Sequence, residues 1–266
     1  AEAEQPMLDV ELAGIEQALA ALGPDTEGLV ELRVQRLRVA GKNDEAEKMA
    51  VDALNRDPKR SALYFVLAEL AIGKGEMEAA EGYYQKAADA DPTDAQALVR
   101  LAQLRADRGD TDKTIQAFQE ATKRAPHDSD LLANYASLLI QAGRLDEAAG
   151  VAKDLVARFP SVAEGYAIQA QLAFQSGKVP EANTLLEKAL AVNPKALDLY
   201  TMLYVGYVMT KEPDKSVGVL DRLLKVDPDG RMRIAQTLLQ TGQIEGATGL
   251  LEKEHACFVR QEVVWK

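Results

Sequence analysis

The sequence predicts an all-α fold, a solenoid of stacked antiparallel helix pairs, and two regular spacings carry that prediction. Prolines recur every thirty-four residues, at Pro24, Pro58, Pro92, Pro126, Pro160, Pro194 and Pro228. Glycines recur with the same interval, at Gly41, Gly75, Gly109, Gly143 and Gly177. A fixed period of this length is typical of a repeat array, in which each unit buries its apolar face against its neighbours and not in a closed core.

One copy of the pattern shows how each unit is built. In residues 74–92, KGEMEAAEGYYQKAADADP, Gly75 precedes the acidic residue Glu78, and Asp91-Pro92 ends the segment. Glycine after a helix favours the left-handed conformation that ends it. An acid in the first turn of the next helix complements the helix dipole. Each unit therefore reads as helix, glycine turn, helix and proline turn.

Small residues recur at matched places in both helices of the unit. Alanines stand midway through the first helix, at Ala68, Ala102, Ala136 and Ala170, and early in the second, at Ala46, Ala80, Ala148 and Ala182. Such rows let antiparallel helices approach closely, so we expect these alanines to be buried where the helices meet.

We predict six full repeats, numbered 1 to 6, with positions 1 to 34 in each. They cover residues 27–60, 61–94, 95–128, 129–162, 163–196 and 197–230. A shortened unit follows at 231–254, so the predicted solenoid spans 27–254. Residues 1–26 are predicted to hold an N-terminal capping helix, because apolar residues in 7–22 are spaced by three and four. Residues 255–266 form a C-terminal tail that either folds back over the last helix or docks on another chain.

The pattern resembles the tetratricopeptide repeat (TPR), and the resemblance covers residues 27–230. It is carried by Tyr64, Leu67, Ala68, Gly75, Ala80, Tyr84, Ala87 and Pro92 and by their counterparts. The resemblance implies a bacterial-type array of about six full repeats wound as a right-handed superhelix. Three departures stand out, namely Arg105 at position 11 of repeat 3, Thr114 in place of a second-helix alanine, and Lys211 in place of the turn glycine of repeat 6.

In proteins of this family the first helices line a concave groove that accepts a partner peptide or helix. The resemblance carries the groove over to positions 2, 5, 9, 12 and 13 of the repeats. The predicted groove residues are Glu31, Gln35, Arg38, Phe65, Glu69, Ile72, Val99, Gln103, Ala133, Ser137, Gln141, Ala167, Gln171, Phe174, Gln175, Thr201, Val205 and Met209. Glutamine recurs at position 9, where its amide either hydrogen-bonds an extended partner backbone or simply suits a solvent-facing helix.

Charge narrows the class of partner. The formal net charge of −11 argues against nucleic acid and against an anionic membrane surface. No run of about eighteen apolar residues is present to insert into a bilayer. The clamp that this family uses for acidic chaperone tails requires lysine at position 5 and asparagine at position 9, and this sequence has neither there. We therefore expect a protein or peptide partner that is neutral or basic.

The sequence holds no constellation for catalysis. His127 and His255 lie in different regions, and the single cysteine, Cys257, has no second ligand pair nearby for zinc. The recurring glycines are explained by turns and not by phosphate binding. We predict no catalytic residue, no metal and no cofactor. The chain is predicted not to be an enzyme, unless partner chains supply the missing groups.

Two interpretations of function follow. In the first, the chain is a protein-interaction scaffold that binds its partner along the groove, within a bacterial multi-protein assembly. In the second, it is a structural subunit that forms an oligomer or larger complex through its ends and tail. The predicted assembly surface of the second is Tyr200, Tyr204 and Tyr207 in repeat 6 with Phe258 and Trp265 in the tail.

The first residues, AEAEQP, bear on location. They lack an initiator methionine, which indicates either that a secretory leader was removed after small residues or that the sequence is an excised fragment. We therefore expect a periplasmic or otherwise exported protein, with a cytoplasmic location as the alternative.

Overall fold

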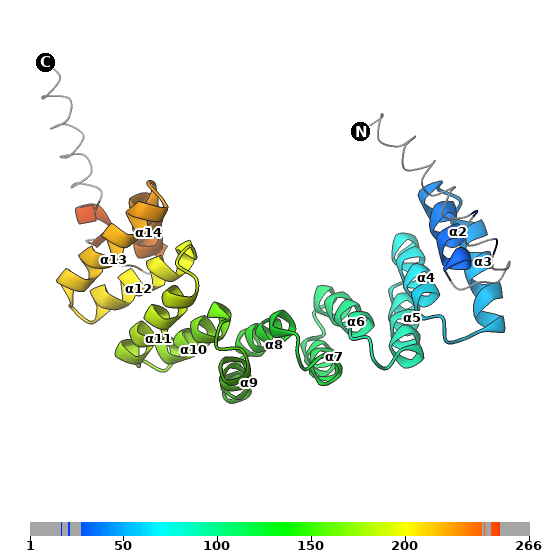
Figure 1. Cartoon of the computed structure of the whole chain (residues 1–266), viewed down its shortest axis with the longest axis horizontal. Coiled ribbons are helices and arrows are strands. Elements are labelled where there is room, and N and C mark those ends of the chain that lie inside the picture. The colour runs from blue at the N-terminus through cyan, green and yellow to red at the C-terminus, as the bar shows by residue number, and fades with distance from the viewer. Residues whose placement is uncertain (1–16, 18–20, 22–27, 241, 243–245, 251–266) are drawn as a thin grey trace, which may run out of the picture. The chain divides into compact units, whose positions relative to one another are not determined.

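A computed structural model describes residues 17, 21, 28–240, 242 and 246–250, and every helix or strand assigned in these residues is an α-helix. The chain divides into two compact units, residues 1–131 (the N-terminal unit) and 132–266 (the C-terminal unit), which are described separately. Within each unit, consecutive helices pack side by side as antiparallel pairs (Figure 1). The predicted all-α solenoid of stacked helix pairs is confirmed.

The N-terminal unit contains three helix pairs. They are α2 (Leu29–Val39) with α3 (Asn43–Arg56), α4 (Ser61–Lys74) with α5 (Met77–Ala90), and α6 (Gln96–Asp107) with α7 (Thr111–Arg124). Each second helix also packs against the first helix of the next pair, α3 against α4 and α5 against α6.

The C-terminal unit repeats this arrangement. Its helices are α9 (Leu145–Arg158), α10 (Ala163–Gln175), α11 (Val179–Val192), α12 (Leu197–Met209), α13 (Pro213–Val226) and α14 (Gly230–Gln240). Helix α8 (Ser129–Gln141) begins before the division between the units and lies mostly in this one. Helix α14 lies where the sequence predicts a shortened unit from residue 231 onward.

The turn glycines adopt the predicted left-handed conformation. Gly75 has φ +80°, and Gly109 and Gly177 have φ +77° and +72°. In repeat 6, where Lys211 replaces glycine, the lysine takes the same conformation with φ 59°. A side chain is strained there by about 1–2 kcal/mol, so the geometry of the repeat outweighs the preference of the residue.

The alanine rows lie in the core, as predicted. Ala68, Ala80, Ala170 and Ala182 are all fully buried. Thr114, which takes the place of one such alanine, is 1% exposed and donates a hydrogen bond from its hydroxyl to the carbonyl oxygen of Asp110 at 2.8 Å. The buried hydroxyl of Thr114 therefore has its hydrogen bond at the start of its own helix.

The three tyrosines of repeat 6 do not form a surface, and that part of the predicted assembly site is wrong. Tyr200, Tyr204 and Tyr207 are 4%, 9% and 9% exposed and belong to the core cluster of the C-terminal unit. Helix α12 is apolar around its whole circumference and packs against α11, α13 and α14. Burial on several sides follows from such a sequence.

Several predictions fall on residues whose placement is not described. The capping helix in residues 1–26 is almost wholly among them, as is the tail at 255–266 with Phe258 and Trp265. They lie outside the described residues. Within residues 246–250, Ala247 and Leu250 are 1% and 5% exposed, so this segment turns an apolar face inward.

Candidate protein-binding surface

In the N-terminal unit the predicted groove residues form a polar rim above a half-buried apolar strip. Gln35, Glu69 and Gln103 are exposed on α2, α4 and α6. Phe65, Ile72 and Val99 are partly buried and pack against the hydrophobic core. This combination of apolar area and polar groups is what a peptide-binding surface requires.

Two of these residues contact each other across the repeat boundary. The guanidinium of Arg38 on α2 forms an ion pair with the carboxylate of Glu69 on α4. The pair ties position 12 of one repeat to position 9 of the next. Both groups keep substantial exposure, at 29% and 44% of their side-chain area. The pair is therefore accessible to a partner, and it neutralises charge on this part of the surface.

Phe65 is held in place by an aromatic contact. Its ring meets the ring of Tyr84 on α5 edge to face, with centroids 5.7 Å apart and planes at 73°. Such pairs add about 1 kcal/mol beyond the area that they bury. Burial raises the pKa of the Tyr84 hydroxyl, so Tyr84 stays neutral at physiological pH. Phe65 therefore presents a rigid apolar edge.

Glu31 has a different role from the one predicted. Its carboxylate accepts a 2.6 Å hydrogen bond from the backbone N–H of Gly28, the residue just before helix α2. It also lies 3.5 Å from the guanidinium of Arg60, the residue just before helix α4. Its side chain is only 19% exposed, so Glu31 caps helix α2 and links it to the end of its own repeat.

In the C-terminal unit the accessible part of the predicted groove lies on α10. Gln171 and Gln175 are exposed, and Phe174 is partly buried between them. The ring of Phe174 points toward α12, since a Cβ added to Gly206 would lie 3.1 Å from its Cζ. On α8, the Ser137 hydroxyl donates to the Ala133 carbonyl oxygen at 2.9 Å and so is bound within its own helix.

Helix α12 corrects the rest of the prediction. Thr201 and Val205 are 5% and 7% exposed, so they belong to the core and do not line an accessible groove. The Thr201 hydroxyl donates to the Asp198 carbonyl oxygen at 2.7 Å and is satisfied there. Met209, at the end of the helix, is 52% exposed.

The C-terminal unit also has a concave feature that lies outside the predicted groove. A hollow of about 350 Å³ lies between α9, α10 and α11, on the face of α10 opposite Gln171 and Phe174. Its wall includes Lys153, Ala173 and Leu185. These residues lie outside the groove positions, so the predicted groove does not include them. In the sequence, only a comparison of the residue at position 11 across the repeats could have indicated the hollow.

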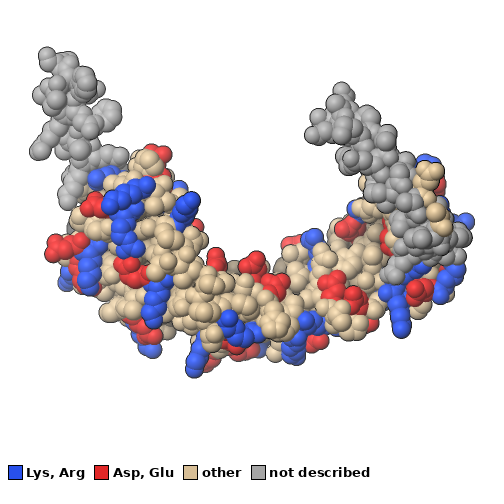
Figure 2. All heavy atoms as spheres, viewed as in Figure 1, with Lys and Arg blue, Asp and Glu red and all other residues tan. Residues whose placement is uncertain are grey.

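Charges of both signs are interspersed on the visible face of each unit (Figure 2). Among the described residues, no group of three or more histidine, cysteine, aspartate or glutamate side chains is placed to hold a metal ion. Within the same part of the chain, no helix combines the length and apolar character needed to cross a membrane.

Comparison with known proteins agrees with this architecture. Residues 32–95 and 105–172 each match a protein family described as Tetratricopeptide repeat. No curated protein sequence matches the chain. Among solved structures, the C-terminal part of a TPR repeat-containing protein from Cytophaga hutchinsonii superposes with a TM-score of 0.64 at 17% identity, covering 85% of this chain and 95% of that one.

Two further solved structures share the fold. MamA from Desulfovibrio magneticus has a TM-score of 0.53 at 17% identity, over 65% of this chain and 97% of that one. YrrB, described as a TPR protein with an unusual peptide-binding site, has a TM-score of 0.52 at 18% identity, over 68% and 93%.

The fold, the repeat register and the surface define an α-solenoid of the kind that serves as a protein-interaction scaffold. The chain belongs to the tetratricopeptide repeat proteins. This family is generally non-catalytic.

Proposed function

We propose that this protein is a non-catalytic scaffold that binds a neutral or basic peptide or protein through the first helices of its repeats. The observation that carries the proposal is the paired arrangement of exposed glutamine and half-buried phenylalanine, Gln171 with Phe174 on α10. The peptide-binding site named for YrrB supports the peptide as a ligand class for this fold.

The side chains on α10 suit an extended segment. A glutamine amide both donates and accepts, so Gln171 and Gln175 match the N–H and C=O groups of a partner backbone. Phe174 supplies the apolar contact beside them, and aromatic residues of this kind carry much of the energy at protein interfaces. In the N-terminal unit, Gln103 and Phe65 offer the same two kinds of group.

The net charge of −11 supports a neutral or basic partner. A negative protein speeds its encounter with a positive partner, and salt screens that attraction. We therefore expect the association rate to fall as ionic strength rises, with a smaller change in the dissociation rate. A bacterial multi-protein assembly is the setting that we propose for this binding.

The test begins with peptides selected from a random phage-displayed library on the purified chain. Binding of the selected peptides is then measured by fluorescence polarisation for Phe65→Glu combined with Phe174→Glu. We expect a loss of at least tenfold in affinity, because each substitution places a charge in an apolar contact. Val217→Glu, at a 49% exposed position on α13, is the matched control and should bind normally. Unchanged binding by the double variant would remove this surface from consideration.

A further inference from the structure

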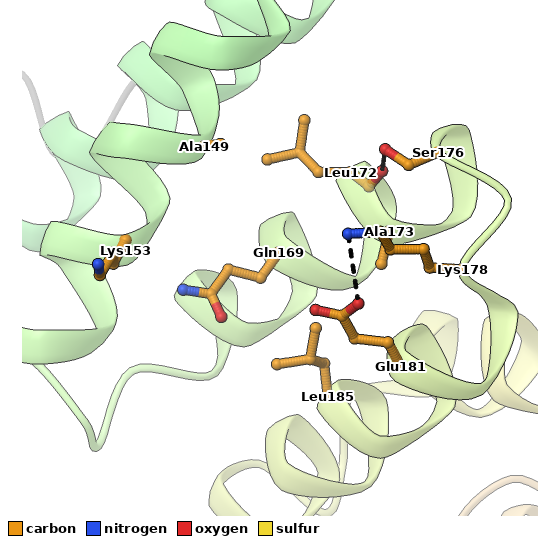
Figure 3. Close-up of a pocket in the computed structure, with 9 residues that line it drawn as sticks. All are labelled: Ala149, Lys153, Gln169, Leu172, Ala173, Ser176, Lys178, Glu181 and Leu185. Atoms are coloured by element: carbon orange, nitrogen blue, oxygen red, sulfur yellow. Dashed lines mark hydrogen bonds and ion pairs between the residues drawn. The ribbon is translucent and has the colours of Figure 1, made fainter.

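The hollow between α9, α10 and α11 lies wholly within the C-terminal unit. Figure 3 shows Ala149 on α9 opposite Leu172 on α10, with Lys153 farther along α9 and Leu185 on α11 at the lower side. Its volume of about 350 Å³ lies within the range of small-molecule and side-chain pockets. The groove positions of α10 lie on the other face of the same helix, so this is a separate surface.

The residue at position 11 of this repeat lines the hollow and is small. Position 11 is Ala173 in repeat 5, but Arg105 in repeat 3 and Tyr207 in repeat 6. Both larger side chains reach position 19 of their own repeat. Arg105 donates to the Lys113 carbonyl oxygen at 3.5 Å, and the Lys215 ammonium lies 5.3 Å from the Tyr207 ring centroid.

Two neighbouring positions do not compensate for the small residue. In repeat 2, position 11 is also alanine, but Tyr83 at position 23 packs into the core there. Position 23 of repeat 5 is the smaller Leu185. At the hollow, position 21 of the preceding repeat is Ala149. The same position is Glu81 at the Arg105 interface and Asn183 at the Tyr207 interface. Two alanines and one leucine thus meet where larger side chains stand at the other interfaces.

The filled interface around Tyr207 shows which side chain fits such a site. The Tyr207 hydroxyl lies 3.5 Å from the carboxylate of Glu187, at position 25 of the preceding repeat, with the Lys215 cation against its ring. Position 25 at the hollow is Lys153, one of the residues that line it. The carboxylate of Glu181, which also lines the hollow, is already paired with Lys178, so an arginine like Arg105 would meet the two lysine ammonium groups with like charge.

A tyrosine side chain would interact favourably with the ammonium of Lys153. The phenolic oxygen accepts a hydrogen bond from an ammonium, and the ring face attracts a cation with about 0.5–2 kcal/mol. A second ammonium stands at the rim, on Lys178, which forms a 3.8 Å ion pair with Glu181 (Figure 3). Leu172 and Leu185 supply apolar walls for the faces of the ring.

We propose that this hollow is a second docking site, in which a partner protein inserts a tyrosine side chain at the place that Tyr207 fills in the next repeat. The partner's tyrosine would then fill the interface between α9, α10 and α11 that the chain's own side chains leave open. The site lies on the opposite face of α10 from the proposed peptide surface, so the chain can hold two partners or two parts of one partner at once.

The test uses the full chain and the capped tripeptide acetyl-Gly-Tyr-Gly-amide, with the corresponding Leu and Arg tripeptides as comparisons. Methyl NMR signals of Leu172 and Leu185 report binding. We expect saturable shifts with the tyrosine peptide, at least fivefold tighter than with either comparison peptide. Absence of a saturable shift, or equal binding of all three peptides, would overturn the proposal.

Two variants locate the binding. Ala173→Tyr fills the hollow with the chain's own side chain and should abolish the shifts. Ala149→Phe blocks the rim from an exposed position, so the fold is not at risk, and should do the same. Gln171→Ala, on the other face of α10, should leave the titration unchanged and so separates this site from the proposed peptide surface. Shifts that persist in both blocking variants would refute the assignment.

The other candidate occupant is a second copy of the chain. Sedimentation equilibrium across a hundredfold range of concentration detects it. A monomer throughout, with tyrosine-peptide binding intact, supports a partner-supplied side chain. Self-association that is lost in both Ala173→Tyr and Ala149→Phe would assign the hollow to a second copy and would overturn the proposal as stated.

Discussion

The α5–α6 and α11–α12 interfaces lie at the same place in the repeat, but different kinds of side chain hold them together. In the N-terminal unit, α6 carries Arg105, whose Nε donates to the Glu81 carboxylate on α5 at 3.1 Å. In the C-terminal unit, α12 carries Tyr207 at the same position of the repeat, and its hydroxyl lies 3.5 Å from the Glu187 carboxylate on α11. The repeat thus fixes where neighbouring helices meet, and the residues at positions 11 and 21 decide whether ion pairs or aromatic packing hold them.

The two interfaces also differ in the groups that meet across them. At the Arg105 interface, Arg108 adds 2.6 and 2.7 Å hydrogen bonds to Glu81 and Glu78. At the Tyr207 interface the backbone itself is in contact, since a Cβ on Gly206 would lie 1.9 Å from Asn183 Oδ1. Long charged side chains span one interface, and direct packing closes the other.

The largest effect that we expect comes from truncating position 11. Tyr207→Ala removes a nearly buried ring and should lower the free energy of unfolding by about 3 kcal/mol. Arg105→Ala removes a partly exposed ion pair and should cost only about 1 kcal/mol. Urea denaturation followed by circular dichroism measures both. Equal losses in the two variants would contradict the distinction between the interfaces.

Gly206→Ala tests the close approach of α12 to α11. The added methyl group would displace Asn183, and we expect a loss of about 2 kcal/mol. The Asn183 amide is 3% exposed, and neither of its polar atoms has a hydrogen-bond partner among the described residues. Asn183→Ala should therefore cost little by itself and should rescue Gly206→Ala in the double variant.

Gly218→Ala on α13 is the matched control for this experiment. A Cβ at Gly218 meets nothing within 4 Å, so the helix propensity of alanine should raise the free energy of unfolding by about 0.5–1 kcal/mol. A Gly206→Ala protein that is as stable as Gly218→Ala would show that α12 has room to move away from Asn183.

The sequence predicted the repeated elements well and the individual interfaces poorly. The thirty-four-residue period located the helix pairs and the left-handed turns, because each depends on residues within a single repeat. It misplaced Thr201, Val205 and the α12 tyrosines, because it assigned to a surface side chains that the neighbouring helices bury. The hollow was not predicted for the same reason, since it depends on the volumes of Ala149, Ala173 and Leu185, which lie on three different helices.

Lys211 offers a test of smaller magnitude beside the Tyr207 interface. It holds a left-handed conformation that glycine adopts freely, so Lys211→Gly should stabilise the protein by about 1 kcal/mol. Gly177→Ala is the converse variant, at φ +72° with no atom within 4 Å of the new Cβ, and should cost a similar amount. Thermal unfolding of the two variants measures both changes in stability, an increase for Lys211→Gly and a decrease for Gly177→Ala. A Lys211→Gly protein that is less stable than the parent would mean that the lysine side chain makes a contribution larger than its strain.

The smallest effect concerns the charged interface of the N-terminal unit. Glu81→Gln removes the charge that Arg105 and Arg108 share, while the side chain keeps its volume. We expect a loss of about 0.5–1 kcal/mol at low salt, because both arginines stay partly exposed and solvent weakens the attraction. At 1 M NaCl the screening length is about 3 Å, so the difference from the parent protein should largely disappear. Tyr207→Ala should instead keep its full loss in high salt, because salt does not screen apolar packing. If the Glu81→Gln difference persists in 1 M NaCl, then hydrogen-bond geometry, and not net charge, holds the helices of this interface together.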